Sequence, residues 1–312
     1  MLYLVGWGRS GTTIVENILN AYDGIFSAGE LHYLWERGFV EGRRCGCGQL
    51  VAECPLWNEV LGVAYGPRRP DPKQVVALQQ RRARIRHTRR LCDRELDPDT
   101  HEYRDLLARL YTAIAKVTRA RLIVDSSKRP PGAAMLTRMQ PEITGYLLHV
   151  VRDPRAVAYS WNRLIRQPDR VDPAAVLNRH GSLNSTVHWL VWNRLAEYVA
   201  QAYPATRQRR LRYEDFVADP YPTIRAVLDF VGYPGLDGPS DGPFVDATTV
   251  RLAANHTISG NPRRFDTGDV PISRDDAWRR QQAAVPRLVA SLTSLPLQRR
   301  YGYPMWVSDD ER

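Results

Sequence analysis

The sequence predicts an α/β fold with three α/β/α layers, a central parallel sheet and helical or irregular insertions. Two observations carry this prediction. Short apolar segments alternate with segments of helical periodicity, which is typical of a parallel sheet covered by helices. The first apolar segment also runs directly into a glycine-rich turn and a helix, as in many ligand-binding α/β proteins. The 312 residues are enough for one large domain.

Five short segments, most of them apolar, are predicted to be strands, although the second could also be an extended segment. They are Leu2–Val5, Gly24–Glu30, Arg121–Asp125, Ile143–Val151 and Arg209–Tyr213. Ligands of open parallel sheets bind outside the carboxyl ends of the strands. Three of these ends carry a cation, at Arg9, Lys128 and Arg152, so we expect an anion site at this edge of the sheet.

Helices are predicted where apolar residues recur at intervals of three and four. They begin at Ile14 and Arg155 and span Pro72–Asp93, Thr100–Arg119, Leu183–Ala202, Ile224–Val231 and Ser273–Leu292. Two stretches rich in glycine and proline, 36–70 and 232–272, are predicted to be irregular. We therefore expect residues 36–120 to form an insertion in the α/β unit.

The chain is strongly basic, with a net charge of +10. Arginine supplies most of this charge, because only three of the 44 basic residues are lysines. The sequence has no alternation of aromatic and basic residues that would bind single strands, and no zinc-finger or RNP pattern. The charge therefore favours a small, highly anionic ligand over nucleic acid.

No apolar run approaches the ~18–20 residues that a membrane-spanning helix needs. The N-terminus enters the first strand directly, which leaves no room for a signal peptide. We therefore expect a cytoplasmic protein with no transmembrane segment. The sequence leaves open whether the protein forms a homodimer.

The turn Gly6–Thr13 (GWGRSGTT) is predicted to form an anion-binding cradle at the N-terminus of the helix that follows it. Its glycines fit two patterns, the G-x-G-x-x-G of dinucleotide-binding folds and the G-x-x-x-x-G-K-[ST] of the P-loop. Thr12 occupies the position of the P-loop lysine, and we expect Arg9 to supply the missing positive charge. This stretch alone leaves both patterns open.

A second anion site is predicted in Arg152–Ser160 (RDPRAVAYS), after the Ile143–Val151 strand. Arg152 leaves the strand, and Ser160 lies two helical turns further on. A guanidinium and a hydroxyl together suit a phosphate that the Gly6–Thr13 turn does not hold. The sequence therefore predicts a ligand with two anionic ends, whereas the pyrophosphate of a dinucleotide needs only one site.

Together these stretches resemble the sulfotransferases that use 3′-phosphoadenosine 5′-phosphosulfate (PAPS), above all the carbohydrate and tyrosylprotein branches and their bacterial relatives. The resemblance covers residues 1–30, 121–163 and 207–231, where GRSGTT, VRDPRAVAYS and LRYEDF occur in the family's order. It implies a P-loop-like fold, a single sulfotransferase domain over residues 1–312, and PAPS as co-substrate with no metal required.

The resemblance also implies roles for individual residues. The 5′-phosphosulfate would be held by Gly8, Arg9, Ser10, Gly11, Thr12 and Thr13, and the 3′-phosphate by Arg152 and Ser160. The remaining predicted cofactor contacts are Tyr213 in LRYEDF and Ser259, Asn261 and Arg263 in the position of the family's late cofactor-covering loop. The family often has a further arginine where this chain has Leu164, which leaves Arg163 or a C-terminal arginine as the third 3′-phosphate contact.

For catalysis, the resemblance to the tyrosylprotein branch implies that Glu30 is the general base, because that branch has a glutamate 21 residues after the loop arginine, the spacing of Arg9 and Glu30 here. A carboxylate is ionised at pH 7 and can accept the proton of a hydroxyl. Arg9 is expected to stabilise the leaving phosphate, and Lys128 to contact the transferring sulfonate. Two rival interpretations are that Glu30 binds a ribose, as in dinucleotide-binding folds, and that His32 is the base.

The acceptor implied by the resemblance is a hydroxyl of a small molecule, a carbohydrate or a lipid, with residues 36–120 forming part of the acceptor side. Three other functions remain open. A P-loop nucleotide kinase would share the fold, although Thr12 lacks the charge of the P-loop lysine. A dinucleotide oxidoreductase and a non-catalytic nucleotide-binding protein are the others, and the last needs no base at Glu30.

The four cysteines are interpreted first as structural thiols. Cys45, Cys47 and Cys54 lie close together in sequence, and Cys92 follows at a distance. Zinc is the alternative, with Cys92 as a fourth ligand, although this spacing is unusual. A disulfide is disfavoured in a reducing cytosol.

Overall fold

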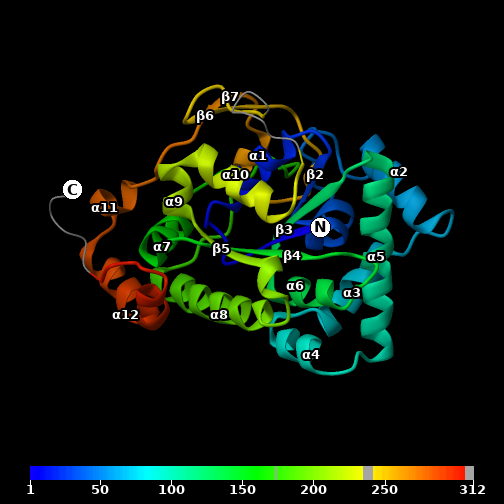
Figure 1. The fold of residues 1–312 in the computed structure, drawn as a ribbon, viewed down its shortest axis with the longest axis horizontal. Coiled ribbons are helices and arrows are strands. Elements are labelled where there is room, and N and C mark those ends of the chain that lie inside the picture. Colours follow the sequence, from blue (N-terminus) through cyan, green and yellow to red (C-terminus); the bar gives the residue numbers. More distant parts are fainter. Residues whose placement is uncertain (173, 235–241, 306–312) are drawn as a thin grey trace.

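The centre of the protein is a five-stranded parallel sheet (Figure 1) in a computed structural model that describes residues 1–172, 174–234 and 242–305. The strands are β1 (Leu2–Val5), β2 (Ile25–Gly29), β3 (Leu122–Lys128), β4 (Tyr146–Val151) and β5 (Gln208–Arg212). They lie in the order β2-β3-β1-β4-β5, and every neighbouring pair is parallel. The predicted α/β class and its five strands are confirmed.

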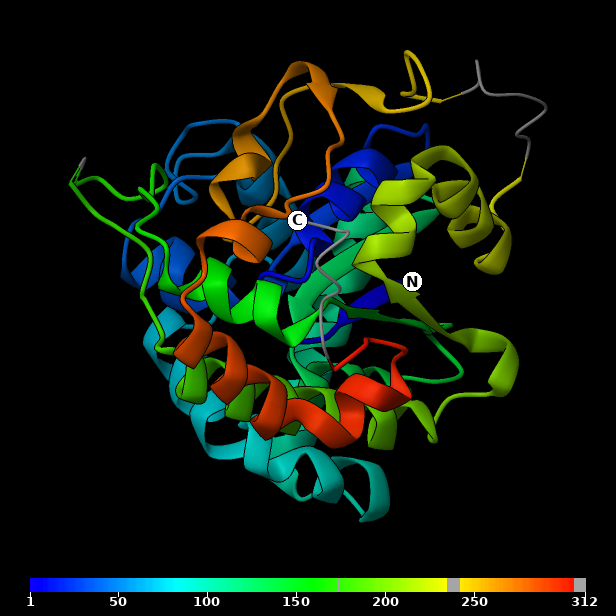
Figure 2. The same ribbon diagram turned by 90° about the vertical axis from the view of Figure 1, so that its left-hand side faces the viewer.

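Helices cover both faces of the sheet, which gives the three predicted layers (Figures 1 and 2). One face packs against α1 (Thr12–Asn20), α9 (Tyr213–Ala218) and α10 (Pro220–Phe230), and the other against α5 (Pro98–Thr118), α6 (Pro130–Thr137) and α8 (Ser182–Ala200). Along β1, Leu2 and Leu4 pack on the α1 side, whereas Tyr3 and Val5 pack on the other side. Strands buried on both faces are mostly apolar, as β1 is throughout.

The order of the strands brings distant parts of the chain together. Because β3, β1 and β4 are neighbours, their carboxyl ends place Lys128, the loop after β1 and Arg152 along one edge of the sheet. This edge is where parallel sheets bind ligands.

The segment between β2 and β3 is mostly helical. It contains η1 (Leu31–Tyr33), the π-helical segment η2 (Leu34–Val40), α2 (Pro55–Tyr65), α3 (Pro72–Arg82), η3 (Ile85–His87), α4 (Thr88–Asp93) and α5. The prediction that residues 36–70 are irregular is wrong for α2, whose buried Trp57, Val60 and Leu61 follow helical spacing. This segment shares its core with the sheet, because Trp57 and β-strand residues such as Val5 belong to one apolar cluster.

The single helix predicted over Pro72–Asp93 is also wrong. The chain turns through η3, with Arg84 extended, between α3 and α4. Helix α3 packs on η2 and α5, whereas α4 packs on α6 and α8. The two halves therefore face different partners, which one straight helix could not reach.

The C-terminal part adds elements that flank the sheet. These are α7 (Pro154–Asn162), η4 (Ala205–Arg207), the antiparallel pair β6 (Thr249–Leu252) and β7 (Gly268–Pro271), η6 (Pro262–Phe265), α11 (Ala277–Gln281) and α12 (Ala284–Arg300). The β6–β7 pair was not predicted, and the single helix predicted over Ser273–Leu292 is wrong. The break falls before Pro286, which has no N–H to continue a preceding helix but fits the first turn of α12. Figure 2 shows α12 lying along α8.

Within the described ranges, no helix is both long and apolar enough to cross a membrane.

Candidate active site

The loop between β1 and α1 has the backbone of an anion cradle. Gly6, Arg9 and Gly11 have positive φ angles of 144°, 71° and 85°. The Ser10 hydroxyl donates to the Trp7 carbonyl at 2.8 Å, which closes the turn. Gly11 is the N-cap of α1 and brings no side chain to the first-turn N–H groups. These N–H groups and the helix dipole make this end of α1 suited to a negative charge.

Two aromatic rings pack so closely on this loop that glycine is required. A Cβ on Gly11 would lie 2.3 Å from Cδ2 of Tyr213, and a Cβ on Gly8 would lie 2.8 Å from Cζ2 of Trp161. The predicted cofactor residue Tyr213 is therefore a wall of the loop. Trp161 also stacks beneath Arg9, whose guanidinium carbon lies 4.9 Å from the ring centroid.

Arg152 joins the two predicted anion sites. Its Nη1 donates to the Arg9 carbonyl at 3.2 Å, and its guanidinium lies 4.4 Å from the centroid of the Tyr213 ring. Its Nη2 lies 3.3 Å from a carboxylate oxygen of Asp275, and Nη1 of Arg163 lies 3.6 Å from the same oxygen. Arg152 and Arg163, the two candidate 3′-phosphate arginines, thus form ion pairs with the same carboxylate, that of Asp275. The role of Arg163 stays a prediction.

The helix after Arg152 is capped independently of it. The Asp153 carboxylate accepts from the backbone N–H of Arg155 at 2.9 Å and pairs with the Arg155 guanidinium at 2.6 Å. Arg152 is consequently not the partner of its neighbouring aspartate. Ser160 is buried two turns into α7, with 8% of its surface exposed.

The LRYEDF segment supports both loops at once. While Tyr213 packs on Gly11, the Glu214 carboxylate accepts from the backbone N–H of Asp153 at 3.0 Å and from the Tyr303 hydroxyl at 2.8 Å. The segment therefore fixes the junction after β4 relative to the loop after β1.

Glu30 lies in a cluster of four side chains, which we call the Glu30 cluster: Glu30, Arg37, Lys128 and Ser259. Lys128 Nζ lies 2.5 Å from Glu30 Oε1, and Arg37 Nη1 lies 3.3 Å from Oε2. Arg37 Nη1 also donates to the Ser259 hydroxyl at 2.6 Å. Burial alone would raise the pKa of Glu30, but Lys128 and Arg37 together outweigh it and lower the pKa. Glu30 is therefore ionised at neutral pH.

The Glu30 cluster depends on unusual backbone geometry. Lys128 and Ser259 have positive φ angles of 67° and 54°, as Arg9 does, and strained backbones of this kind concentrate at functional sites. A parallel bridge holds Ser259 in place, because Ile258 donates to the Ala28 carbonyl at 2.9 Å and the Glu30 N–H donates to the Ile258 carbonyl at 2.7 Å.

Arg9, in the predicted donor site, interacts electrostatically with Glu30. Its pKa is lowered to about 10, because burial and, to a lesser extent, the charge of Arg163 outweigh the opposing charge of Glu30. The guanidinium remains protonated at neutral pH.

Of the three residues predicted in the late cofactor-covering loop, Ser259, Asn261 and Arg263, only Ser259 contacts the Glu30 cluster among the described contacts. Ser259 reaches the Glu30 cluster, but the Asn261 side chain caps η6 by accepting from the Arg263 N–H at 3.0 Å. The Arg263 guanidinium pairs with Asp266 at 3.0 Å. The loop still covers α1, because the Asn17 side chain donates to the Arg263 carbonyl at 3.1 Å.

Residues 2–237 match the model of one protein family, described as the sulfotransferase family. The chain belongs to the sulfotransferase family. In fold it is similar to a sulfotransferase domain from the curacin biosynthetic pathway, with 19% identity, a TM-score of 0.56 and coverage of 97% of this chain and 98% of that one. The sulfotransferase domain of the Synechococcus PCC 7002 olefin synthase is also similar, with 17% identity, a TM-score of 0.52 and coverage of 97% and 94%. No curated protein matches the sequence.

Family and fold together confirm the predicted resemblance and the P-loop-like α/β/α architecture. For the Gly6–Thr13 turn, the sequence left open a dinucleotide-binding pattern and a P-loop pattern. The family favours the P-loop pattern, because sulfotransferases have the P-loop-like fold. The residue roles remain predictions that the geometry described above can support.

Two buried or partly buried charged residues close to the predicted site of this member of the sulfotransferase family were not predicted from sequence. Arg37 lies in the π-helical segment η2, for which the sequence has no visible signal. Glu16 lies on α1, with its side chain fully buried, and accepts hydrogen bonds from the Ser126 hydroxyl and, at 3.2 Å, from the Ser27 hydroxyl. The pKa of Glu16 is raised to about 7, because burial outweighs the nearby charge of Lys128. The only signal for Glu16 in the sequence was the presence of a glutamate among the apolar residues of the predicted helix that begins at Ile14.

Proposed function

We propose that this member of the sulfotransferase family transfers the sulfuryl group of PAPS to a hydroxyl group, with adenosine 3′,5′-bisphosphate (PAP) as the other product. One observation carries the proposal. Arg152, from the end of β4, donates to the carbonyl of Arg9, in the loop after β1, at 3.2 Å. The two predicted anion-binding segments therefore meet at one edge of the sheet, which supports a nucleotide with separate 5′ and 3′ phosphate groups as the donor.

The residues at this edge fit such a donor. Gly11 and the first turn of α1 leave room and free N–H groups for the 5′ end, where a side chain would collide with Tyr213. The buried Nε of Arg152 has no hydrogen-bond partner among the described residues, so a donor is available for a further anionic oxygen. Ser160 would add a hydroxyl to this second site.

The proposed reaction forms a bond between the acceptor oxygen and sulfur and breaks the bond between sulfur and the bridging phosphate oxygen. The hydroxyl proton passes to Glu30, which the charges of Lys128 and Arg37 keep ionised. A low pKa makes Glu30 a weak base, so the proton moves late, when bond formation to sulfur has made the hydroxyl acidic. Negative charge then develops on the leaving phosphate, where Arg9 and the α1 N–H groups stabilise it.

Lys128 is proposed to act both before the reaction, on Glu30, and during transfer, on the sulfonate. It pairs with Glu30 at 2.5 Å and so holds the carboxylate ionised and oriented. The same ammonium group lies at the end of β3, on the edge of the sheet where we propose that the donor binds. We infer that it shares its charge between Glu30 and the sulfonate oxygens during transfer.

The acceptor side is proposed to lie on the segment between β2 and β3, because Arg37 comes from that segment. The Gln79 side chain on α3 also donates to the His32 carbonyl at 3.1 Å, which ties α3 to the residues after Glu30. A small-molecule, glycan or lipid hydroxyl fits this proposal.

The test compares the thermal stability of the protein with PAP, with ATP and Mg²⁺, and with NAD. We expect PAP alone to raise the melting temperature, because it carries both the 5′ and the 3′ phosphate. A shift with ATP and Mg²⁺ alone would favour a kinase, and a shift with NAD alone an oxidoreductase. No shift with PAP overturns the proposal. Transfer of radioactive sulfate from labelled PAPS to a panel of hydroxyl compounds then tests catalysis.

A further inference from the structure

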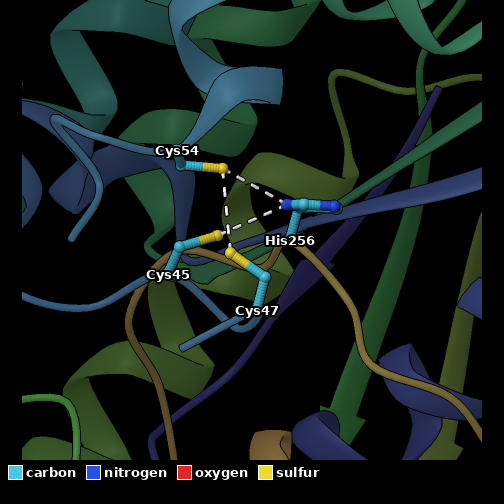
Figure 3. Close-up of side chains that lie close together, drawn as sticks. All are labelled: Cys45, Cys47, Cys54 and His256. Carbon is cyan, nitrogen blue, oxygen red and sulfur yellow. Dashed lines mark hydrogen bonds between the residues drawn. The ribbon is translucent and has the colours of Figure 1, made fainter. Parts of the chain in front are cut away.

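Three cysteines and one histidine that the proposed reaction does not use converge on one point (Figure 3). Cys45, Cys47 and Cys54 come from the segment before α2, whereas His256 lies some 200 residues later, between β6 and η6. Cys45 and Cys54 are fully buried, and Cys47 and His256 are partly buried. In Figure 3 the three sulfur atoms and one ring nitrogen of His256 point toward one another.

Three of the six distances between the ligand atoms are close to the edges of a metal tetrahedron. Nδ1 of His256 lies 3.3 Å from Sγ of Cys54 and 3.7 Å from Sγ of Cys45. Sγ of Cys47 lies 3.8 Å from Sγ of Cys54, and all four atoms lie within 4.8 Å of one another. With zinc–sulfur bonds of ~2.3 Å and zinc–nitrogen bonds of ~2.0–2.1 Å, tetrahedral geometry requires edges of about 3.8 Å and about 3.6 Å.

A disulfide does not explain this cluster. A disulfide needs its sulfur atoms at about 2.05 Å, whereas the sulfurs of Cys47 and Cys54 are 3.8 Å apart. All four cysteines of the chain are free thiols in the structure. Three thiols and an imidazole facing one another form only weak hydrogen bonds, so their convergence needs another cause.

The backbone holds the four side chains in position from both segments. Gly48 donates to the Cys45 carbonyl at 2.9 Å in a tight turn, and Gly46 donates to the Thr257 carbonyl at 3.0 Å. A Cβ on Gly46 would lie 2.0 Å from Oδ1 of Asn255, so only glycine allows this approach. Trp57 donates from its indole to the His256 carbonyl at 2.9 Å, which fixes the histidine from the α2 side.

We propose that Cys45, Cys47, Cys54 and His256 bind one structural Zn²⁺ ion. Three thiolates and one imidazole form a closed set of four ligands, which is typical of structural rather than catalytic zinc. On binding, three Zn–S bonds and one Zn–N bond form, the three thiol protons leave to solvent, and no electron is transferred. Cys92, the fourth ligand suggested by the sequence, lies on α4 and is not part of the group.

The zinc site fastens two distant segments of the chain. His256 lies three residues before Ser259, and the Gly46–Thr257 hydrogen bond joins the same two segments. Arg264 strengthens this junction, because it donates to the Arg44 carbonyl at 2.7 Å. The metal would therefore stabilise the strand-like segment that pairs with Gly29, and this role does not depend on the identity of the substrate.

The first experiment measures metal content by inductively coupled plasma mass spectrometry. The full chain is produced in zinc-supplemented medium and freed of any tag. We expect about one zinc per chain in the wild type and in Cys92→Ser, and less than about 0.2 in Cys54→Ser and His256→Ala, because a closed site needs all four ligands. Cys92→Ser is the matched control, since it makes the same change outside the cluster.

The second experiment uses only the wild type, so it does not depend on the folding of a variant. Titration with a mercurial reagent should release zinc to a chromophoric chelator as the cluster thiols are blocked. Reconstitution with Co²⁺ should give the intense visible bands of a tetrahedral thiolate site. The proposal is overturned if the wild type contains no zinc or contains iron in its place. It is also overturned if Cys54→Ser retains the zinc of the wild type.

Discussion

The predicted donor site and the Glu30 cluster lie side by side but are built in opposite ways. The donor side uses short contiguous motifs, Gly6–Thr13 and Arg152–Ser160, each placed where a strand ends. The side chains around Glu30 come from three distant segments: Lys128 from β3, Arg37 from η2 and the Ser259 hydroxyl from the segment after β6. Binding of a fixed anion thus depends on local backbone shape, whereas control of one carboxylate depends on long-range contacts.

This difference predicts that binding and transfer can be separated by mutation. Changes in the Glu30 cluster should alter turnover and its pH dependence. Changes on the donor side should alter nucleotide affinity. The predictions below test this separation in order of decreasing expected effect.

Glu30→Gln should have the largest effect. The amide cannot accept the hydroxyl proton, so we expect kcat to fall by ~10²–10⁴-fold while the Kd for PAP changes less than about twofold. Radioactive sulfate transfer and isothermal calorimetry measure the two quantities. His32→Gln is the matched comparison. Full turnover in Glu30→Gln with loss in His32→Gln would assign the base to His32 instead, whose pKa burial holds well below its usual range.

Arg152→Ala should weaken PAP binding by roughly 10–100-fold, because charge-assisted hydrogen bonds contribute about 1.5–3 kcal/mol each. Calorimetry with PAP and with adenosine 5′-phosphate measures this effect, and the loss should be smaller for the ligand without a 3′-phosphate. Arg251→Ala removes the same charge at an exposed ion pair with Asp269 and serves as the control. Equal losses for both ligands would contradict a 3′-phosphate site.

Glu16→Gln should stabilise the protein at alkaline pH. Burial raises the pKa of Glu16 from 4.5 to about 7, so the folded state binds more protons than the unfolded state between these values. Stability is therefore lost as pH rises through this range. The variant lacks this loss and should gain up to about 3 kcal/mol at pH 8 and much less near pH 5. Urea unfolding at both pH values measures the difference, and an identical gain at both would contradict the assignment.

Arg37→Gln should have the smallest effect on turnover at its optimum, at most about threefold, because the pair is partly exposed to solvent. Burial raises the pKa of Glu30, and the charge of Arg37 counteracts this effect. Without that charge the pKa of Glu30 should therefore rise. The acidic limb of the kcat/KM profile should then move to higher pH. A rate–pH profile from pH 4 to 9 tests this, and an unmoved limb would mean that Arg37 does not influence the base.

Much of the fold and of the donor side could be predicted because their signals are local. Most of the strand segments are short and contain an apolar run, and Gly11 and Arg152 follow two of them at short spacing. The helix break within Pro72–Asp93 could not be predicted, since the partners on which each half packs lie elsewhere in the chain. Arg37 and Glu16 were missed for the same reason. The break within Ser273–Leu292 did have a local signal, Pro286, which the periodicity of the apolar residues hid.

The cysteines show the limit most directly. The sequence places Cys45, Cys47 and Cys54 near one another, but it offers Cys92 as the only further thiol. His256 joins them because the segment after β6 returns to β2, where Ile258 pairs with Gly29. The sequence by itself determined the parallel sheet and the family, and it predicted an anion-binding edge on that sheet. Only the tertiary structure decided the partners of Glu30 and the fourth ligand of the cysteine group, because contacts between distant segments leave no local pattern in a single sequence.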